Sequence, residues 1–297
     1  MRQAFFSAKA GNSIVAVAAT VCFLLIGAPK ADAAGSKWYV GASVPVMYID
    51  DTDTVTQGSN IDPSQPLAPP STYRGKAVNK YDTGFKLEGV IGYEFRPNMR
   101  IELELFYSEA EVDKLTYSGI STVTPLGPVS LPGETETPVS GDAEQIGAML
   151  NLWYDIDLGS KWTPYVGVGV GVIEVDFGEV DYDENALAQY VSNSLRLGAA
   201  QQMALQAGVP FNPANVPLPQ LPPGFVPGVS TTDTVFAYQA AAGVSYQFSD
   251  NVALRLGYRY QTSDDLQFRG RNAFGNTVET KTDFDVQFIE IGVRYHF

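Results

Sequence analysis

After about residue 33 the chain repeats one pattern, in which apolar side chains occupy every second position over stretches of roughly ten residues or more. This alternation with period two is typical of membrane-spanning β-strands, which need about ten residues each. It predicts eight strands, at residues 38–49, 80–95, 99–113, 143–156, 162–176, 234–248, 252–266 and 283–297.

The last predicted strand shows the alternation most clearly. Its apolar face consists of Ile289, Ile291, Val293, Tyr295 and Phe297. Its other face consists of Glu290, Gly292, Arg294 and His296. Residues 99–113 and 252–266 alternate in the same way, so each strand has one face for an apolar environment and one for a polar environment.

The connections between the predicted strands alternate in length. Residues 96–98, 158–161 and 249–251 make tight turns. The long polar connections span residues 50–79, 114–142, 177–233 and 267–282. Short turns on one side and long loops on the other are the plan of bacterial outer-membrane barrels. The pattern therefore predicts an all-β fold, an eight-stranded antiparallel transmembrane up-and-down β-barrel with long extracellular loops.

Alternation alone does not distinguish this fold from a soluble barrel, such as a lipocalin-like fold, with the apolar face turned inward. Glycines and charges share the face opposite the apolar one, which favours lipid outside. Aromatic residues at the short-turn ends of the strands predict an interfacial girdle. These are Trp38, Tyr93, Phe95, Tyr154, Trp162, Tyr246, Phe248, Tyr295 and Phe297. We interpret Tyr295 and Phe297 as a C-terminal assembly signal for the barrel-assembly machinery.

The first residues of the chain have the pattern of an export signal. A basic start precedes the apolar run Ile14–Gly27, and Ala31-Asp32-Ala33 fits a signal-peptidase site. We therefore expect a cleavable signal peptide at residues 1–33 and a barrel at residues 34–297. The only cysteine, Cys22, lies within the apolar run, and Val21 before it disfavours lipid attachment.

Removal of residues 1–33 would remove three basic residues and one acidic residue, which changes the formal charge from −14 to −16. A surface this acidic argues against nucleic-acid binding, which needs basic side chains. It would also repel anionic lipid headgroups unless divalent cations bridge the two.

The polar faces of the strands carry ten charged residues that would point into the barrel. They are Lys86, Glu88, Glu94, Arg100, Glu102, Glu104, Arg255, Arg259, Glu290 and Arg294. Five cations face five anions, and an eight-stranded bore is only wide enough for side chains to fill it. The balance favours a closed, mutually paired interior over a narrow or gated passage, which is the alternative.

Two local features refine this picture of the interior. The turn at Pro97 would place Glu94 and Arg100 opposite each other near the periplasmic mouth, where they would help to close it. Gly167, Gly169 and Gly171 would make room for long Arg and Glu side chains opposite them.

Several stretches resemble a known family when they are taken together, in order and spacing. They are KWYVG at 37–41, GFKLEGVIGYEFRPNMRIELELFYSEAEV at 84–112, LNLWYDI at 150–156, TPYVGVGVGV at 163–172, ALRLGYRY at 253–260 and IEIGVRYHF at 289–297. They resemble the eight-stranded outer-membrane proteins of the porin-like and surface-antigen families of alphaproteobacteria, including the rickettsial major surface proteins. The resemblance implies a surface-exposed barrel, with weak pore activity or adhesive roles in some members. It implies no catalytic residues, and it does not extend to the long third loop.

Catalytic and metal-binding patterns are weak in this sequence. Barrel enzymes that use histidine need it near the outer rim, whereas the single histidine, His296, follows the last predicted strand to its periplasmic end. Two acidic runs, at residues 50–53 and 176–184, could attract calcium, but neither has the spacing of a dedicated calcium loop. We therefore expect no enzyme activity, cofactor or metal site.

The third long connection, residues 177–233, is long enough to have structure or a role of its own. Residues 185–207 lack proline and place Leu187, Val191 and Leu195 at helical spacing, so they predict a helix that Gly208 and Pro210 would stop. A proline-rich, extended return follows. Either the helix caps the barrel mouth, or the loop presents a surface to a host or neighbouring cell.

The sequence as a whole predicts an integral outer-membrane barrel with a structural, antigenic or adhesive role at the cell surface. The alternative is a low-conductance porin for small hydrophilic solutes, and a barrel enzyme is less favoured. The expected partners are outer-membrane lipid, lipopolysaccharide and the assembly machinery, with a surface partner for the loops.

Overall fold

The computed structural model describes residues 37–60, 71–124, 127–130, 134–138, 141–177, 184–216, 232–271 and 277–297. The expected signal peptide at residues 1–33 lies outside these residues.

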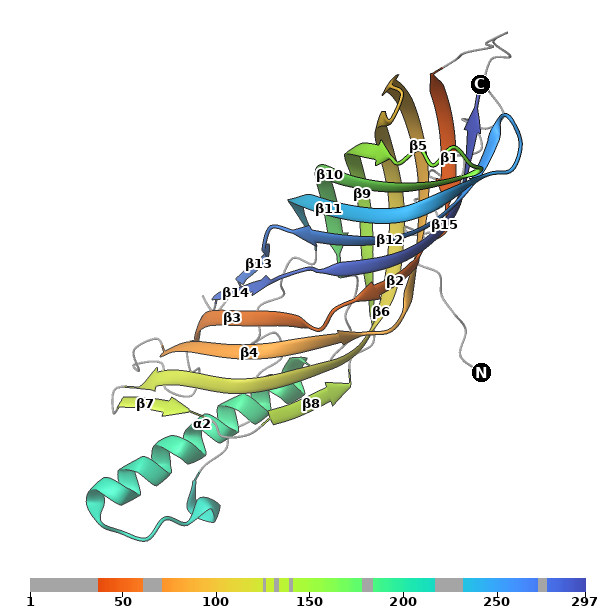
Figure 1. Cartoon of the computed structure of the whole chain (residues 1–297). Coiled ribbons are helices and arrows are strands. Elements are labelled where there is room, and N and C mark those ends of the chain that lie inside the picture. The colour runs from red at the N-terminus through yellow and green to blue at the C-terminus, as the bar shows by residue number, and fades with distance from the viewer. Residues whose placement is uncertain are drawn as a thin grey trace.

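The described elements are mostly strands, with one long helix (Figure 1). In chain order they are β1 (Trp38–Ser43), β2 (Val46–Ile49), β3 (Thr52–Asn60), β4 (Ser71–Tyr81), β5 (Gly84–Arg96), β6 (Met99–Thr124), β7 (Gly127–Ser130), β8 (Glu134–Pro138), β9 (Asp142–Asp155), β10 (Trp162–Asp176), α2 (Glu184–Ala207), the short 3₁₀ helix η1 (Pro213–Asn215), β11 (Thr232–Gln247), β12 (Val252–Ser263), β13 (Leu266–Arg271), β14 (Thr277–Thr282) and β15 (Val286–His296).

A closed antiparallel barrel is formed by β1 with β2, β5, β6, β9, β10, β11, β12 and β15. The ring closes where β15 pairs with β1, with Tyr39 opposite His296 and Ser43 opposite Gly292. The eight predicted strands match these elements to within a few residues, and the predicted fold class is confirmed.

The first barrel strand is interrupted at Val44 and Pro45, which separates β1 from β2. Proline has no backbone N–H to donate to a neighbouring strand. The ladder continues around it, because the Pro45 carbonyl accepts from the Lys86 N–H at 3.0 Å and the Val44 N–H donates to Ile291 at 3.1 Å.

One end of the barrel, here called the turn end, carries the predicted tight turns. They join β5 to β6, β9 to β10 and β11 to β12. In the second turn Gly159 has a positive φ of 63°, and its N–H donates to the Asp157 side chain at 2.8 Å. The opposite end, from which β3, β4 and the long β6 continue, is called the outer end (Figure 1).

The outward face of the barrel strands is an exposed apolar band. Its aliphatic side chains are 38–68% exposed, and they include Ile101, Leu103, Leu105, Leu150, Leu152, Val166, Val168, Val170, Val172, Leu254, Leu256, Ile289, Ile291 and Val293. A continuous apolar surface of this kind is not stable in water. The charged faces point inward and are buried, so the apolar face meets lipid and the soluble alternative does not fit.

The nine aromatics predicted for the girdle lie at the turn end. Adjacent strands bring several of them into contact. The ring centroids of Trp38 and Tyr93 are 4.9 Å apart, and those of Trp162 and Tyr246 are 4.7 Å apart. Tyr295 packs edge to face with Phe297 at 5.7 Å. These rings lie at the border of the apolar band nearest the turn end, where amphipathic aromatics meet the membrane interface.

Beyond the outer end, the strands continue into what we call the outer sheet, in the order β13, β14, β3, β4 and the end of β6 (Figure 1). Both β7 and β8 pair with the end of β6. The prediction of long polar loops at residues 50–79, 114–142 and 267–282 was therefore wrong for most of these residues. They form paired strands that lengthen one side of the barrel.

Threonine explains why the alternation failed to show these strands. On the inward side of the outer sheet, the hydroxyl of Thr54 donates to Thr282 at 3.0 Å and the amide of Asn79 donates to Thr54 at 2.8 Å. Thr54 and Thr282 are buried. Because these inward side chains are polar, hydrophobicity does not alternate along the strands. Threonine nevertheless has a high preference for β-strands.

The predicted helix at residues 185–207 is confirmed as α2, and it ends at Gly208 as expected. Gly208 has a φ of 67°, its N–H donates to Leu205, and the Val209 N–H donates to Ala204 at 3.0 Å. These two hydrogen bonds form the Schellman motif that a glycine after a helix permits.

The helix contacts β7 and β6, and Figure 1 shows it beside the outer sheet, far from the turn end. Of the two alternatives for this helix, a cap over the barrel mouth does not fit these contacts. No helix within the described residues is long and apolar enough to cross a membrane.

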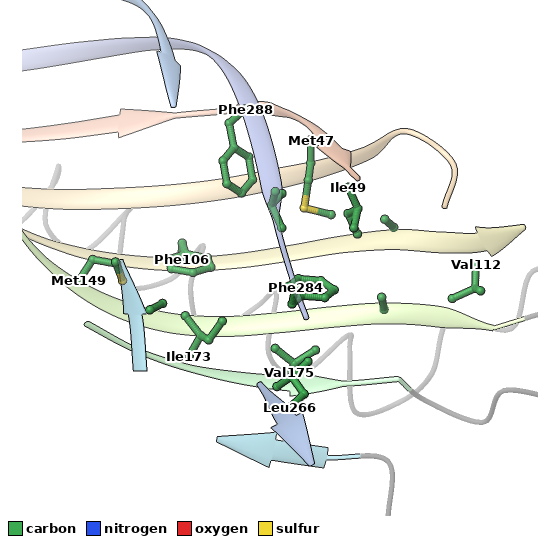
Figure 2. Close-up of a cluster of buried hydrophobic side chains, with 14 of the residues drawn as sticks. Met47, Ile49, Phe106, Val112, Met149, Ile173, Val175, Leu266, Phe284 and Phe288 are labelled. Atoms are coloured by element: carbon green, nitrogen blue, oxygen red, sulfur yellow. The ribbon is translucent and has the colours of Figure 1, made fainter. Parts of the chain in front are cut away.

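The apolar core lies inside the barrel, in its outer half (Figure 2). Its members come from β2, β6, β9, β10, β13, the start of β15 and the residue Phe284 just before it. They include Met47, Ile49, Phe106, Val112, Met149, Ile173, Val175, Leu266, Phe268, Phe284, Val286 and Phe288. The interior therefore closes toward the outside with packed apolar side chains.

A substitution in the apolar band tests whether it faces lipid. Val168 lies in the middle of the outward face of β10 and is 61% exposed. We expect Val168→Arg to destabilise the barrel in phospholipid vesicles by about 2–4 kcal/mol, because an arginine near the bilayer midplane loses its hydration. The measurement is urea unfolding followed by tryptophan fluorescence. The control, Gln57→Arg on the outward face of β3, should be near neutral, and equal stability of both variants would contradict lipid contact at β10.

Candidate functional site

The barrel interior brings the predicted charged residues together. Alternation on β5, β6, β12 and β15 points them inward, and nine of the ten are at most 5% exposed: Lys86, Glu88, Arg100, Glu102, Glu104, Arg255, Arg259, Glu290 and Arg294. Glu94, near the turn end, has a side chain that is 35% exposed. Buried charges are stable only with partners, so the geometry of the pairing decides what this site can do.

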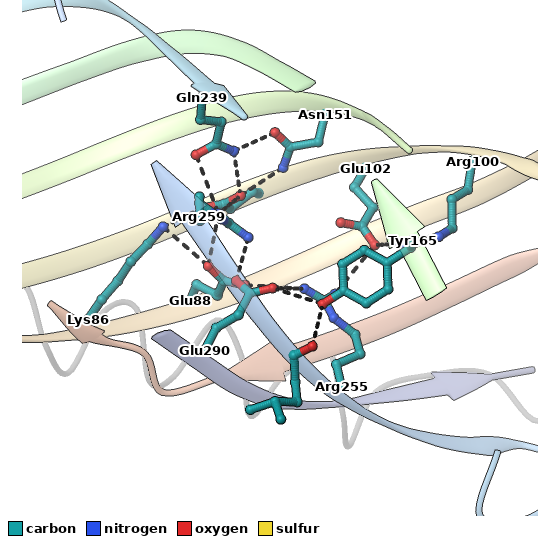
Figure 3. Close-up of polar contacts among 12 residues, drawn as sticks. Lys86, Glu88, Arg100, Glu102, Asn151, Tyr165, Gln239, Arg255, Arg259 and Glu290 are labelled. Carbon is teal, nitrogen blue, oxygen red and sulfur yellow. Dashed lines mark hydrogen bonds and ion pairs between the residues drawn. The ribbon is translucent and has the colours of Figure 1, made fainter. Parts of the chain in front are cut away.

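Figure 3 shows polar contacts of the network in the bore. Glu104 is its centre. One of its oxygens accepts from the Lys86 ammonium at 2.6 Å. The other accepts from the Arg259 guanidinium at 2.6 Å, from the Asn151 amide at 2.7 Å and from Gln239 at 3.1 Å. Two cations and two amides from four strands thus converge on one carboxylate, which ties opposite walls of the barrel together.

Glu290 links the two arginines of β12. Its Oε2 accepts from Arg259 at 2.7 Å, and its Oε1 accepts from Arg255 at 3.2 Å. Glu88 lies within ion-pair distance of the same two arginines, at 3.2 Å from Arg259 and 3.8 Å from Arg255. Tyr165 donates its hydroxyl to Glu290 at 3.3 Å. Arginines and carboxylates therefore alternate through the middle of the bore.

Nearer the turn end, Arg100 forms a third group of contacts. Its guanidinium donates to Glu102 at 2.6 Å and to Asp155 at 2.8 Å. The Tyr39 hydroxyl donates to the same oxygen of Glu102 at 2.8 Å. Glu102 also lies 3.5 Å from Arg255, which connects this group to the middle of the network.

The expected partnership of Glu94 with Arg100 is present in the backbone register but not in the side-chain contacts. The two residues are directly opposite each other on β5 and β6. However, Arg100 points to Glu102 and Asp155, and the Glu94 carboxylate lies 3.7 Å from the His296 imidazole. The neighbouring strand β9 supplies the nearer carboxylate, Asp155, which lies outside the β5–β6 hairpin.

Arg294 differs from the other interior cations. It is 5% exposed, its Nε and Nη1 have no hydrogen-bond partner among the described residues, and its guanidinium carbon lies 5.2 Å from the centre of the Tyr39 ring. The positive charge is stabilised by the face of this ring rather than by a carboxylate in direct contact. The His296 imidazole stacks on the same Tyr39 ring, with ring centroids 5.2 Å apart.

The glycines of β10 make room for side chains, as predicted, but those side chains are not arginines or glutamates. A Cβ on Gly167 would overlap the Trp153 ring, and one on Gly169 would overlap the Asn151 amide. A Cβ on Gly171 would meet the Met149 sulfur at 2.5 Å. The absence of side chains on β10 therefore lets β9 fill the bore.

Several polar residues in the network were missed from the sequence. They are Tyr39, Asn151, Trp153, Asp155, Tyr165 and Gln239. Each lies at an inward position of a strand that was correctly predicted, so counting every second residue along β1, β9, β10 and β11 would have found them.

The charged network ends where the apolar cluster begins, and Lys86 marks the boundary. Its ammonium lies 4.1 Å from the centre of the Phe106 ring and 4.7 Å from that of Phe288. The half of the bore nearer the turn end is thus filled by charged and amide side chains. The half nearer the outer end is filled by aromatic and aliphatic side chains.

The arrangement has features of a structural interior rather than of a reactive centre. Its carboxylates are held by arginines, lysine and amides, and His296 lies at the turn end beside Glu94. Within the described part of the chain, no group of three or more metal-ligating side chains could hold an ion. The acidic run at residues 176–184 lies largely outside the described residues, so the hypothesis that it attracts calcium stays untested.

Comparison with known proteins supports the fold. A family model described as "Outer membrane protein beta-barrel domain" matches residues 18–297. An "Outer membrane protein" of Gluconacetobacter diazotrophicus is 31% identical over 99 residues, which are 32% of this chain and 22% of that protein. The chain thus spans about a fifth of the length of that relative.

Three solved structures are similar in fold. OprG of Pseudomonas aeruginosa is 15% identical with a TM-score of 0.45, covering 88% of this chain and 98% of its own. Neisserial surface protein A is 17% identical with a TM-score of 0.37, with the same coverage of both chains. The outer membrane protease OmpT of Escherichia coli is 8% identical with a TM-score of 0.35, covering 87% of this chain and 97% of its own.

Removal of the central carboxylate charge tests the network. We expect Glu104→Gln to lower the free energy of unfolding in vesicles by about 3–5 kcal/mol, because Lys86 and Arg259 would remain buried with too little negative charge. The matched control is Glu279→Gln in the outer sheet, whose exposed pair with Arg269 (3.2 Å) should contribute about 1 kcal/mol or less. Urea unfolding measures both variants, and equal losses would show that Glu104 is not a structural centre.

Proposed function

This chain belongs to the outer membrane protein beta-barrel domain family, and we propose that its barrel is a closed anchor that presents the outer sheet and α2 at the cell surface. The role that follows is structural or adhesive, as in a surface antigen, rather than transport or catalysis. The observation that carries the proposal is the filling of the bore along its length.

Two unlike layers fill the bore, and a solute would have to displace both. In the inner layer, the carboxylate of Glu104 is joined to opposite walls by four donors. In the outer layer, Phe106, Met149 and Phe288 are each at most 1% exposed. An eight-stranded barrel has no further width in which a hydrated passage could run beside these side chains.

The outer sheet supports a role at the surface because it is more than the barrel needs for closure. The ring of strands is complete without β3, β4, β7, β8, β13, β14 and α2. The strands among these elements form a paired, hydrogen-bonded platform, and α2 packs against it. An ordered platform can hold a binding surface in place, whereas a flexible loop would lose conformational entropy on binding.

Conductance measures whether the bore is closed. In planar bilayers we expect no stepwise ion conductance from the refolded mature chain, and none from a variant in which residues 178–231 are replaced by a short Gly-Ser turn. The bore is filled beneath that connection, so its removal should not open a path. Steady channels from the full chain would favour the low-conductance porin, and channels that appear only after the deletion would identify the connection as the plug.

Attachment of whole cells tests the surface role. Cells that display the full chain should adhere to a host-cell or abiotic surface more strongly than cells that display the variant without residues 178–231. Surface labelling should first establish equal display, and Glu279→Gln provides a variant with an altered charge but an intact α2. Equal adhesion of cells with the full chain, the deletion variant and Glu279→Gln would contradict an adhesive role and leave a structural role in the envelope.

A further inference from the structure

One buried cation of the bore, Arg294 on β15, has no polar partner among the described residues. Its Nε and Nη1 are buried and make no hydrogen bond there, and no described carboxylate pairs with the guanidinium. The Tyr39 ring, 5.2 Å from the guanidinium carbon, attracts the charge but offers no oxygen to the N–H groups. Unmet donors on a buried charge are costly, so an acceptor from outside the protein would be stabilising here.

Two further unused donors lie near Arg294. They are Nη2 of Arg100 on β6 and Nε1 of Trp153 on β9, and both atoms are buried without a hydrogen-bond partner among the described residues. The guanidinium carbon of Arg100 lies 5.0 Å from the Trp153 ring and 5.9 Å from the Tyr39 ring, which is also the ring beside Arg294. Unused N–H groups from three strands therefore lie in one layer of the bore.

The charge of Arg294 is not balanced by the carboxylates of this layer. Arg100 holds two of them, Glu102 at 2.6 Å and Asp155 at 2.8 Å. The third, Glu94, lies at the mouth and forms no ion pair with Arg294 within the described part of the chain. Water can accept hydrogen bonds from Arg294 but leaves its charge unbalanced, whereas a single negative charge would balance it.

Solvent reaches this layer from the turn end. The side chains of Asp155, His296 and Glu94 are 17%, 21% and 35% exposed there. In the other direction, the network around Glu104 and then the apolar core fill the bore. A ligand would therefore enter at the turn end, which the outer-membrane plan places in the periplasm. It would have to be small, because side chains fill an eight-stranded barrel.

We propose that the turn end of the bore binds one small monovalent anion, a carboxylate or a halide, against Arg294, Arg100 and Trp153. Unused N–H groups beside an unbalanced positive charge suit an acceptor that carries one negative charge. A divalent anion would exceed that charge and would be repelled by Asp155 and Glu94.

The bound anion would have a structural effect on the barrel. It would connect β15 with β6 and β9, and so fasten the last strand beside the place where it pairs with β1. The site goes beyond the proposed surface role, because it lies at the opposite end of the barrel from the outer sheet and needs no partner on another cell.

The indole N–H signals of the tryptophans provide the test. The chain has three tryptophans, Trp38, Trp153 and Trp162. The mature chain, labelled with ¹⁵N, is refolded in detergent micelles, and the variants Trp38→Phe and Trp162→Phe assign the three signals. Sodium acetate and sodium chloride are then titrated separately, while a bulky sulfonate keeps the ionic strength constant.

We expect the Trp153 signal to move and to saturate with acetate, with chloride or with both, and the active salt identifies the ligand as a carboxylate or a halide. The signals of Trp38 and Trp162, which are both 53% exposed at the same end of the barrel, should stay in place. Arg294→Gln should weaken binding by about tenfold or more, because hydrogen bonds to charged groups are stronger than neutral ones. The control, Arg96→Gln, removes an exposed arginine of the β5–β6 turn and should bind like the unaltered chain.

Three results would overturn the anion site. One is an equal shift of all three indole signals, which would show a general effect of salt. Another is unchanged affinity in Arg294→Gln. The third is a response that appears only in Glu94→Gln, which would show that Glu94 already balances Arg294 in the unaltered chain. The titration of the unaltered chain needs no variant of Arg294, so it decides the matter even if that substitution impairs folding.

Discussion

The structure depends on the need to satisfy every backbone N–H and C=O within the hydrocarbon, where no water can replace a missing partner. A sheet meets this need only when its first and last strands pair, and here β15 joins β1 from Tyr39 opposite His296 to Ser43 opposite Gly292. Once the ring is closed, every second residue of each strand enters the bore. The chemistry of the interior is then a consequence of closure, because those side chains must be accommodated without water.

The chain accommodates them in two ways that differ in cost. Packed apolar residues such as Phe106 and Met149 fill the outer half and need no partners. The charged residues of the inner half must be paired, because an isolated buried ion costs several kcal/mol, roughly, even after relaxation. Glu104 with its four donors meets this demand. Such a network gains little net stability over an apolar core, but it specifies one arrangement of the walls, since alternative registers would leave charges without partners.

Much of this could be predicted from the alternation of side chains, because lipid on one side and a filled bore on the other impose a period of two. The eight strands, the tight turns and the helix with its stop at Gly208 follow from local rules. The partner of Arg100 does not follow from local rules. The β5–β6 hairpin places Glu94 opposite Arg100, whereas the ion pair forms with Asp155 of β9. The outer sheet was also missed, because Thr54 and Thr282 bury hydroxyls where the pattern sought apolar side chains.

The outer sheet shows that the two faces of the barrel keep separate identities after the strands leave the membrane. Its inward face stays closed to solvent, with the buried Thr54 and Val278 following the interior positions of the barrel. Its outward face changes from aliphatic side chains such as Ile289 on β15 to charged side chains such as Asp283 and Lys281 between β15 and β14. Strand pairing fixes which face a residue occupies, and the surroundings at each height decide its chemistry.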